Sequence, residues 1–284
     1  MKIYFRRFIF TLTPLKKSYK FQELFQIVPF KAENSPKCSI AKHFPAFIEF
    51  WIEKEFYYQI GDSLDKLAFT ENYLDELINL LSALSNHLFF RYHNEDDSWR
   101  IEYPNIDFKE LTTEQKDYFT NQTSKWSSSI FMYPGYGNDQ IIKQFSEISN
   151  DTINIRPAYH YFTSDPVEKS KGEIEFPDTM ANSLVKYFNL NGKEKEKIRS
   201  VTKLINQGLE ISNRMRSLGF LAYVSSIEGL LNLEYSNTKI KFKCNSFKSI
   251  KESPFTCDEC GEPVWGISAK FYAFLQKYVS KTEK

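Results

Sequence analysis

The chain has 284 residues, which suggests two domains at roughly 100–200 residues per domain. Its composition is 42% hydrophobic and 17% aromatic, which is ample apolar material for packed cores and excludes a disordered chain. Lysine and arginine number 37 and the acids 36, for a net charge of +1. No global field would therefore draw the whole molecule onto nucleic acid, which leaves only a local basic patch for that role.

The N-terminal run MKIYFRRFIFTLTPL contains Arg6 and Arg7, which interrupt its apolar residues. A secretory signal needs an unbroken apolar core of about 7–15 residues, and a membrane span needs about 20. We therefore expect a strand over 3–12 and a cytoplasmic protein with no membrane partner. Three of the four cysteines cluster near the C-terminus, which is not the scattered pattern of a disulfide-bonded domain.

The first part of the chain predicts a mixed domain. Residues 1–60 alternate aromatic and polar positions between prolines, which is typical of strands. Over 70–92 the leucines recur at three- and four-residue spacing, which predicts an amphipathic helix. Weaker patterns predict a strand at 97–104, a helix at 112–126 and a strand at 127–137.

The segment 150–177 is rich in proline and carries Gly172, so we place a domain boundary near residue 170. This makes 1–170 a mixed α/β domain of unknown role and 171–284 a helical domain. Within the helical domain, apolar spacing and end signals predict helices over 178–190, 193–213, 215–235 and 266–279. The stretch 215–231 is apolar nearly all round, which predicts a central buried helix. The expected fold class is α+β.

Three cysteines could hold a metal ion. Cys257, Cys260 and Gly261 form a C-x-x-C-G knuckle, and Cys244 lies upstream of it. Two thiolates at this spacing can hold one ion from a tight turn, and structural zinc takes four ligands. The fourth would come from Cys38, a histidine or another chain. We expect structural zinc at Cys244, Cys257 and Cys260, and the alternative is reduced cysteines in a well-packed loop.

Basic residues gather on either side of Cys244, with Phe242 and Phe247 between them. Positive charge interleaved with aromatic rings suits RNA backbones and stacked bases. The alternative is a solvated hairpin beside the cysteine knuckle. The candidate RNA-binding residues are Lys239, Lys241, Lys243, Lys248 and Lys251.

Glu228 is the lone acid within the apolar stretch 215–231. A buried carboxylate is costly unless it is paired, so Glu228 could face a basic partner or a catalytic centre. The alternative is a surface-facing or structural carboxylate. Close Arg–His spacing occurs only in 91–93 and in 156–160, and we expect the second to lie in a loop because it contains Pro157. Phosphate-loop, serine-elbow and His-Glu-x-x-His motifs are absent from the sequence.

The C-terminal third resembles the Apea-like HEPN family. The resemblance is carried by KLINQGLEISNRMRSLGFLAYVSSIEGLLNLE over 203–234, by the knuckle CDECGEP over 257–263 and by ISAKFYAFLQKYV over 267–279. The block LVKYFNL over 184–190 also fits, and the resemblance covers about residues 178–284. It implies an all-α bundle with the cysteine knuckle as an insertion.

HEPN proteins are helical domains that usually dimerise, and many are metal-independent RNases of prokaryotic defence or toxin systems. The resemblance implies a catalytic Arg followed four to six residues later by His, just after the segment matching 267–279. Such a pair would move the proton of the 2′-hydroxyl and stabilise phosphorane charge. No Arg or His follows Lys270 here, so the catalytic residues are unknown and only Glu228 matches the family nearby.

We therefore expect a HEPN-type protein that is inactive or incomplete in this chain, with the helical domain apparently truncated. Expected partners are RNA, and a second copy or a partner protein that completes the bundle. One alternative is a non-catalytic interaction or sensor module, whose N-terminal domain recognises a protein or small ligand. Another is a zinc-containing nucleic-acid-binding protein that uses the lysine-rich hairpin.

Overall fold

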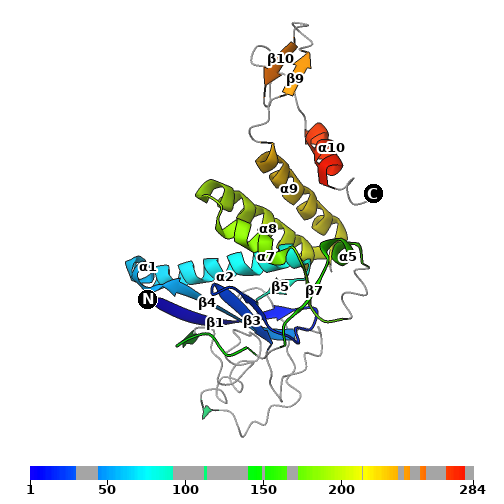
Figure 1. Ribbon diagram of the computed structural model, residues 1–284. Helices are drawn as coiled ribbons and strands as arrows, with labels where there is room; N and C mark the ends of the chain where they lie inside the picture. Colours follow the sequence, from blue (N-terminus) through cyan, green and yellow to red (C-terminus); the bar gives the residue numbers. More distant parts are fainter. Residues whose placement is uncertain are drawn as a thin grey trace. The chain divides into compact units, whose positions relative to one another are not determined.

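The computed structural model shown in Figure 1 describes residues 1–29, 44–91, 112–113, 140–148, 151–164, 172–212, 214–235, 240–243, 250–253 and 267–278. The fold is mixed α+β, with an N-terminal antiparallel sheet followed by several helices. The chain divides into two compact units, Met1–Ala181 and Asn182–Lys284. The predicted boundary near 170, the strands at 97–104 and 127–137, and most of the helix at 112–126 lie outside the described residues.

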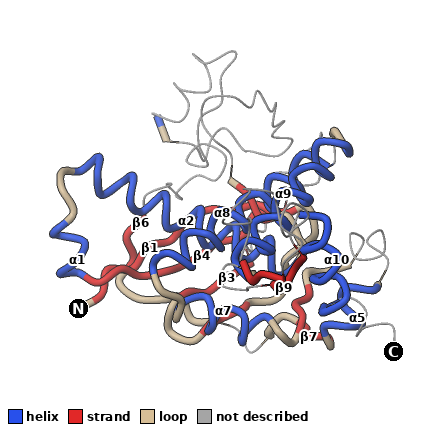
Figure 2. The backbone as a smooth tube through the Cα atoms, turned by 90° about the horizontal axis from the view of Figure 1, so that it is seen from above, coloured by secondary structure: helices blue, strands red, loops and turns tan. Residues whose placement is uncertain are grey.

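The first unit is built on an antiparallel sheet, and the alternation over 1–60 predicts the strands in that part of the chain. Its strands in the described ranges run in the order β2-β3-β4-β1-β5, and β6 also pairs with β1. Figure 2 shows β6, β1 and β4 side by side. The strands are β1 (Lys2–Thr11), β2 (Tyr19–Phe21), β3 (Phe25–Pro29), β4 (Phe44–Glu53), β5 (Phe89–Phe90) and β6 (Gln140–Ile142).

Both faces of the central strands bury large side chains. Successive residues of a strand point to opposite faces, so β1 places Phe5 and Ile9 on one face and Phe8 on the other. Phe5 stacks on Phe50 of β4 with ring centroids 5.5 Å apart. Phe8 packs on Phe47 of β4 at 4.6 Å on the other face. Aromatic side chains therefore form a packed layer on each side of the sheet.

A long helix, α2 (Ser63–Ser85), covers the Phe50 face of the sheet, after the short α1 (Lys54–Gln59) (Figure 1). The leucine spacing predicts this helix over 70–92. In the structure it begins and ends seven residues earlier, at Ser63 and Ser85. It begins early because Asp62 and Asp65 form a capping box, in which Asp62 accepts from the Leu64 and Asp65 amides. It ends at Asn86, which adopts a left-handed conformation with φ of 52°.

The first unit is completed by β7 (Asn154–Arg156), α5 (Ala158–Thr163) and β8 (Glu175–Pro177), with β7 and β8 parallel. The expectation of a loop over 156–160 is wrong, because Pro157 stands at the start of α5 rather than inside it. Asp178 accepts a hydrogen bond from the Ala158 amide at 2.9 Å, which satisfies a donor of the first turn.

In its described residues the second unit consists of helices and a strand hairpin. Its elements are α7 (Met180–Phe188), which spans the division, α8 (Gly192–Ser212), α9 (Arg216–Glu234), β9 (Ile240–Lys243), β10 (Ile250–Ser253) and α10 (Ile267–Tyr278). The predicted helices of this region are confirmed, with every end within two residues of its predicted position. Helices α8 and α9 form an antiparallel pair (Figure 1).

Small residues let α8 and α9 approach closely. A Cβ atom added at Gly208 would lie 2.7 Å from the Tyr223 ring, and one added at Gly229 would lie 2.8 Å from Val201. At Gly219 it would lie 2.1 Å from the Ser212 hydroxyl. Glycine is therefore required at these contacts by space rather than by backbone conformation.

The expectation that 215–231 is a central buried helix is wrong for the structure described. In α9 only Gly219, Ser226 and Leu231 are buried, while Phe220 is 65% exposed. An all-round apolar helix needs a neighbour on every side. Among the described elements of its own unit, α9 packs against α8 along a stripe of small residues and also contacts α10. Part of its surface stays exposed.

Candidate functional sites

The predicted metal ligands Cys244, Cys257 and Cys260 lie outside the described residues, as do Lys239 and Lys248. Within the described ranges no group of three or more His, Cys, Asp or Glu residues could hold a metal ion. Structural zinc at the three cysteines therefore stays a prediction.

The hairpin of β9 and β10 carries the other three candidate lysines. In its register Lys243 is opposite Ile250, Lys251 is opposite Phe242, and Lys241 is opposite Glu252. Opposite residues share a face and successive residues alternate, so Lys241 and Lys243 lie on one face and Lys251 on the other. Glu252 shares the face of Lys241 and Lys243. The three candidate lysines in the described part of the hairpin are therefore divided between its two faces.

Glu228 lies in the middle of α9 and is partly exposed. Its carboxylate therefore does not carry the full cost of burial that the apolar sequence around it implies. Among the residues that the structure describes, no hydrogen bond or ion pair ties Glu228 to another predicted site residue.

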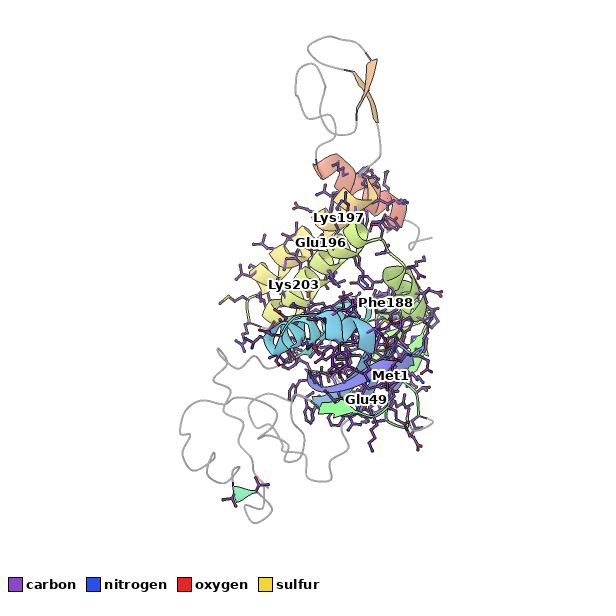
Figure 3. All side chains as sticks on the ribbon, turned by 90° about the vertical axis from the view of Figure 1, so that its left-hand side faces the viewer. Met1, Glu49, Phe188, Glu196, Lys197 and Lys203 are labelled. Atoms are coloured by element: carbon purple, nitrogen blue, oxygen red, sulfur yellow. The ribbon has the colours of Figure 1, made fainter. Side chains whose placement is uncertain are left out.

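A buried polar cluster on the sheet was not predicted from the sequence. Glu49 of β4 has a fully buried side chain, labelled in Figure 3, and it lies opposite Arg6 of β1 and Gln26 of β3 in the sheet register. Its carboxylate accepts from Arg6 Nε at 2.7 Å and from Gln26 Nε2 at 2.7 Å. Three neighbouring strands thus place one row of polar side chains on the same face.

The same carboxylate fastens the segment after β6 to the sheet. The Ser146 amide donates to Glu49 at 2.8 Å and its hydroxyl donates at 2.6 Å. Gln26 also donates to the Ser146 carbonyl at 2.9 Å, and Arg6 donates to the Ser146 hydroxyl. Because the buried charge is paired and fully hydrogen-bonded, we interpret the cluster as a structural clamp rather than a reactive group.

A pocket of about 330 Å³ lies beside this clamp and is called the sheet pocket here. One wall carries an aromatic pair, Tyr4 and Phe145, whose ring centroids are 5.1 Å apart in an edge-on arrangement. Lys20 Nζ lies 2.6 Å from the Glu23 carboxylate and 6.0 Å from the Phe145 ring centroid. The full lining is Tyr4, Lys20, Glu23, Gln26 and residues 144–148.

A second charged cluster joins the opposite face of β1 to α2. Arg7 Nε lies 3.5 Å from Glu71. Arg91 donates from Nη2 to Asp75 at 3.1 Å, and its Nε lies 2.9 Å from the same carboxylate. Arg91 also pairs with Glu71. Burial, and then the nearby charge of Arg7, lower the pKa of the Arg91 guanidinium, which still stays protonated at neutral pH. The arginines are balanced by carboxylates, so this cluster is an ion-pair network and not an anion site.

The first turns of α9 carry an exposed apolar group, the α9 apolar face, which consists of Met215, Leu218, Phe220 and Leu221. At the other end of α9, Glu234 accepts from Lys277 of α10. This hydrogen bond lowers the pKa of the Glu234 carboxyl and raises the pKa of the Lys277 ammonium. The pair joins α10 to the end of α9 that is remote from the apolar face.

Comparison of the chain with protein-family models, with curated proteins and with solved structures finds no match. Of the helices in the described ranges, none is long and apolar enough to cross a membrane.

Proposed function

We propose that residues 182–284 are a HEPN-type helical domain that associates with RNA as a dimer, and that this chain does not itself cleave RNA. The observation that supports the proposal is the order of elements in the second unit. A long antiparallel pair, α8 and α9, is followed by the β9–β10 hairpin and then by α10 against α9. This is the order that the sequence resemblance implies, with the hairpin as the insertion between the last two helices.

The proposed lack of cleavage rests on the composition of the second unit. Residues 182–284 contain no histidine, so this unit has no Arg–His pair of its own. An RNase that uses an Arg–His pair needs both groups against the scissile phosphate, one for charge and one for proton transfer. The expected result is RNA binding with cleavage no faster than in a buffer control.

The proposed dimer uses the α9 apolar face. Exposed apolar groups of this kind mark interaction surfaces. In a dimer with a two-fold axis, the α9 apolar face of each copy would cover that of the other. The matched test is Phe220→Glu against Tyr272→Glu, because these aromatic residues of α9 and α10 are 65% and 64% exposed. Light scattering should show a dimer that Phe220→Glu dissociates and Tyr272→Glu leaves intact. A monomeric parent chain contradicts the dimer.

Contact with RNA is assigned to the β9–β10 hairpin. Each phosphate neutralised by a lysine adds about one to the slope of log affinity against log salt. Replacing both Lys241 and Lys243 by glutamine should therefore lower the slope by up to about two for RNA. Lys251→Gln, on the other face, should change the slope less. If Lys251→Gln lowered the slope as much as each of the other two substitutions does, the RNA contact would not be confined to one face of the hairpin.

A second function is favoured by the same α9 apolar face. If the full chain is monomeric and has no RNA affinity, we propose instead a non-catalytic interaction module in which that face docks a partner protein. A third outcome is distinguished by metal content. One zinc per chain, lost together with RNA affinity on chelation, would indicate a zinc-dependent nucleic-acid-binding protein. In that case Cys257→Ser should lower both the zinc content and the affinity.

A further inference from the structure

We propose that the sheet pocket of the first unit binds a guanidinium group. The group would be either the side chain of an arginine in a partner peptide or a small free guanidine compound. The inference rests on the first unit alone and is independent of the function proposed for residues 182–284.

The charge of the lining favours a cation. Glu23 and Glu147 are both lining residues, and among the described residues that line the pocket Lys20 is the only cationic side chain. The nearby guanidinium of Arg6 is already paired with the buried Glu49. The pocket therefore carries a surplus of negative charge, which disfavours nucleotides and other anions.

The pocket already holds a cation of the protein's own. The Lys20 ammonium is 2.6 Å from Glu23 and 6.0 Å from the centroid of Phe145, so it makes an ion pair beside an aromatic ring. A guanidinium makes both contacts better than an ammonium does. It is planar, more weakly hydrated, stacks on aromatic rings and presents several N–H groups to carboxylates.

The wall of the pocket is fixed before a ligand arrives. Ser146 is held by two hydrogen bonds to Glu49, and Gln26, which is only 1% exposed, holds the Ser146 carbonyl. A preorganised wall lowers the entropy cost of binding.

The size of the pocket fits this ligand. Small-molecule pockets span about 300–1,000 Å³, and the sheet pocket has about 330 Å³, at the lower end. That volume suits a guanidinium with its aliphatic stem, and Tyr4 and Phe145 supply the apolar surface for the stem.

The experiment is a calorimetric titration of the full chain with agmatine, N-acetyl-arginine amide and butylamine. We expect saturable binding of the guanidinium compounds and weaker binding of butylamine. Glu147→Gln should weaken agmatine binding by about two- to fivefold, as expected for one exposed ion pair. The control is Glu173→Gln, a surface carboxylate paired with Lys16 elsewhere in the unit, which should leave the affinity unchanged.

The two ligands distinguish the two sources. N-acetyl-arginine amide binding as tightly as agmatine indicates an arginine of a peptide, and binding of agmatine alone indicates a free guanidine. Lys20→Met should strengthen agmatine binding, because it removes the competing ammonium. The proposal is overturned if neither compound binds saturably, if Glu147→Gln has no effect, or if a nucleotide binds in their place.

Discussion

Replacing Glu49 by alanine should destabilise the first unit more than any surface substitution. The fully buried carboxylate accepts four hydrogen bonds, from Arg6, from Gln26 and twice from Ser146. Removal would leave the Arg6 guanidinium, whose side chain is only 22% exposed, without its counter-ion. Breaking a buried pair on one side costs about 3–5 kcal/mol.

The assay is urea unfolding of the full chain, followed by tryptophan fluorescence. With a denaturant slope of about 2 kcal/mol/M, the midpoint of the first unit should fall by about 1.5–2.5 M. Glu53→Ala is the matched control, because Glu53 lies on the same strand, is exposed and should cost less than about 0.5 kcal/mol. A loss below about 1 kcal/mol for Glu49→Ala would refute the clamp.

Three further predictions concern other parts of the chain. Gly208→Ala should cost about 1–3 kcal/mol by thermal unfolding, because the new methyl group meets the Tyr223 ring, whereas Gly192→Ala, in open space, should not destabilise. Asp62→Ala should cost about 1 kcal/mol and speed hydrogen exchange in the first turn of α2; unchanged exchange would speak against the capping box. Burial raises the pKa of Tyr19 to about 12 from 10.0, so stability should be intact below about pH 10 and fall toward pH 12, with a smaller fall in Tyr19→Phe.

The elements that could be predicted are those whose sequence patterns involve only residues near one another in the chain. The leucine spacing of α2 and the apolar spacing of α8 and α9 depend only on residues within one turn or two of each other. The start of α2 was predicted too late, because the capping box of Asp62 and Asp65 uses aspartate where serine or threonine with glutamate is the usual signature.

Features set by distant residues were not predicted. Glu49 interrupts the apolar run FPAFIEFWI of β4, just as Arg6 interrupts the run of β1, and these two interruptions were the available signal. Nothing local states that the two strands pair with these residues opposite each other. The exposure of Phe220 and the division of the hairpin lysines likewise depend on packing and register, which the composition of a segment does not contain.

The measurement that tests the proposed function most directly is fluorescence anisotropy of a labelled single-stranded RNA titrated with the full chain over a series of salt concentrations. The account predicts binding that weakens as salt rises, with a slope that falls when Lys241 and Lys243 are replaced by glutamine, and RNA that stays uncut. An absence of binding at the lowest salt concentration, or a slope that these substitutions leave unchanged, would contradict it.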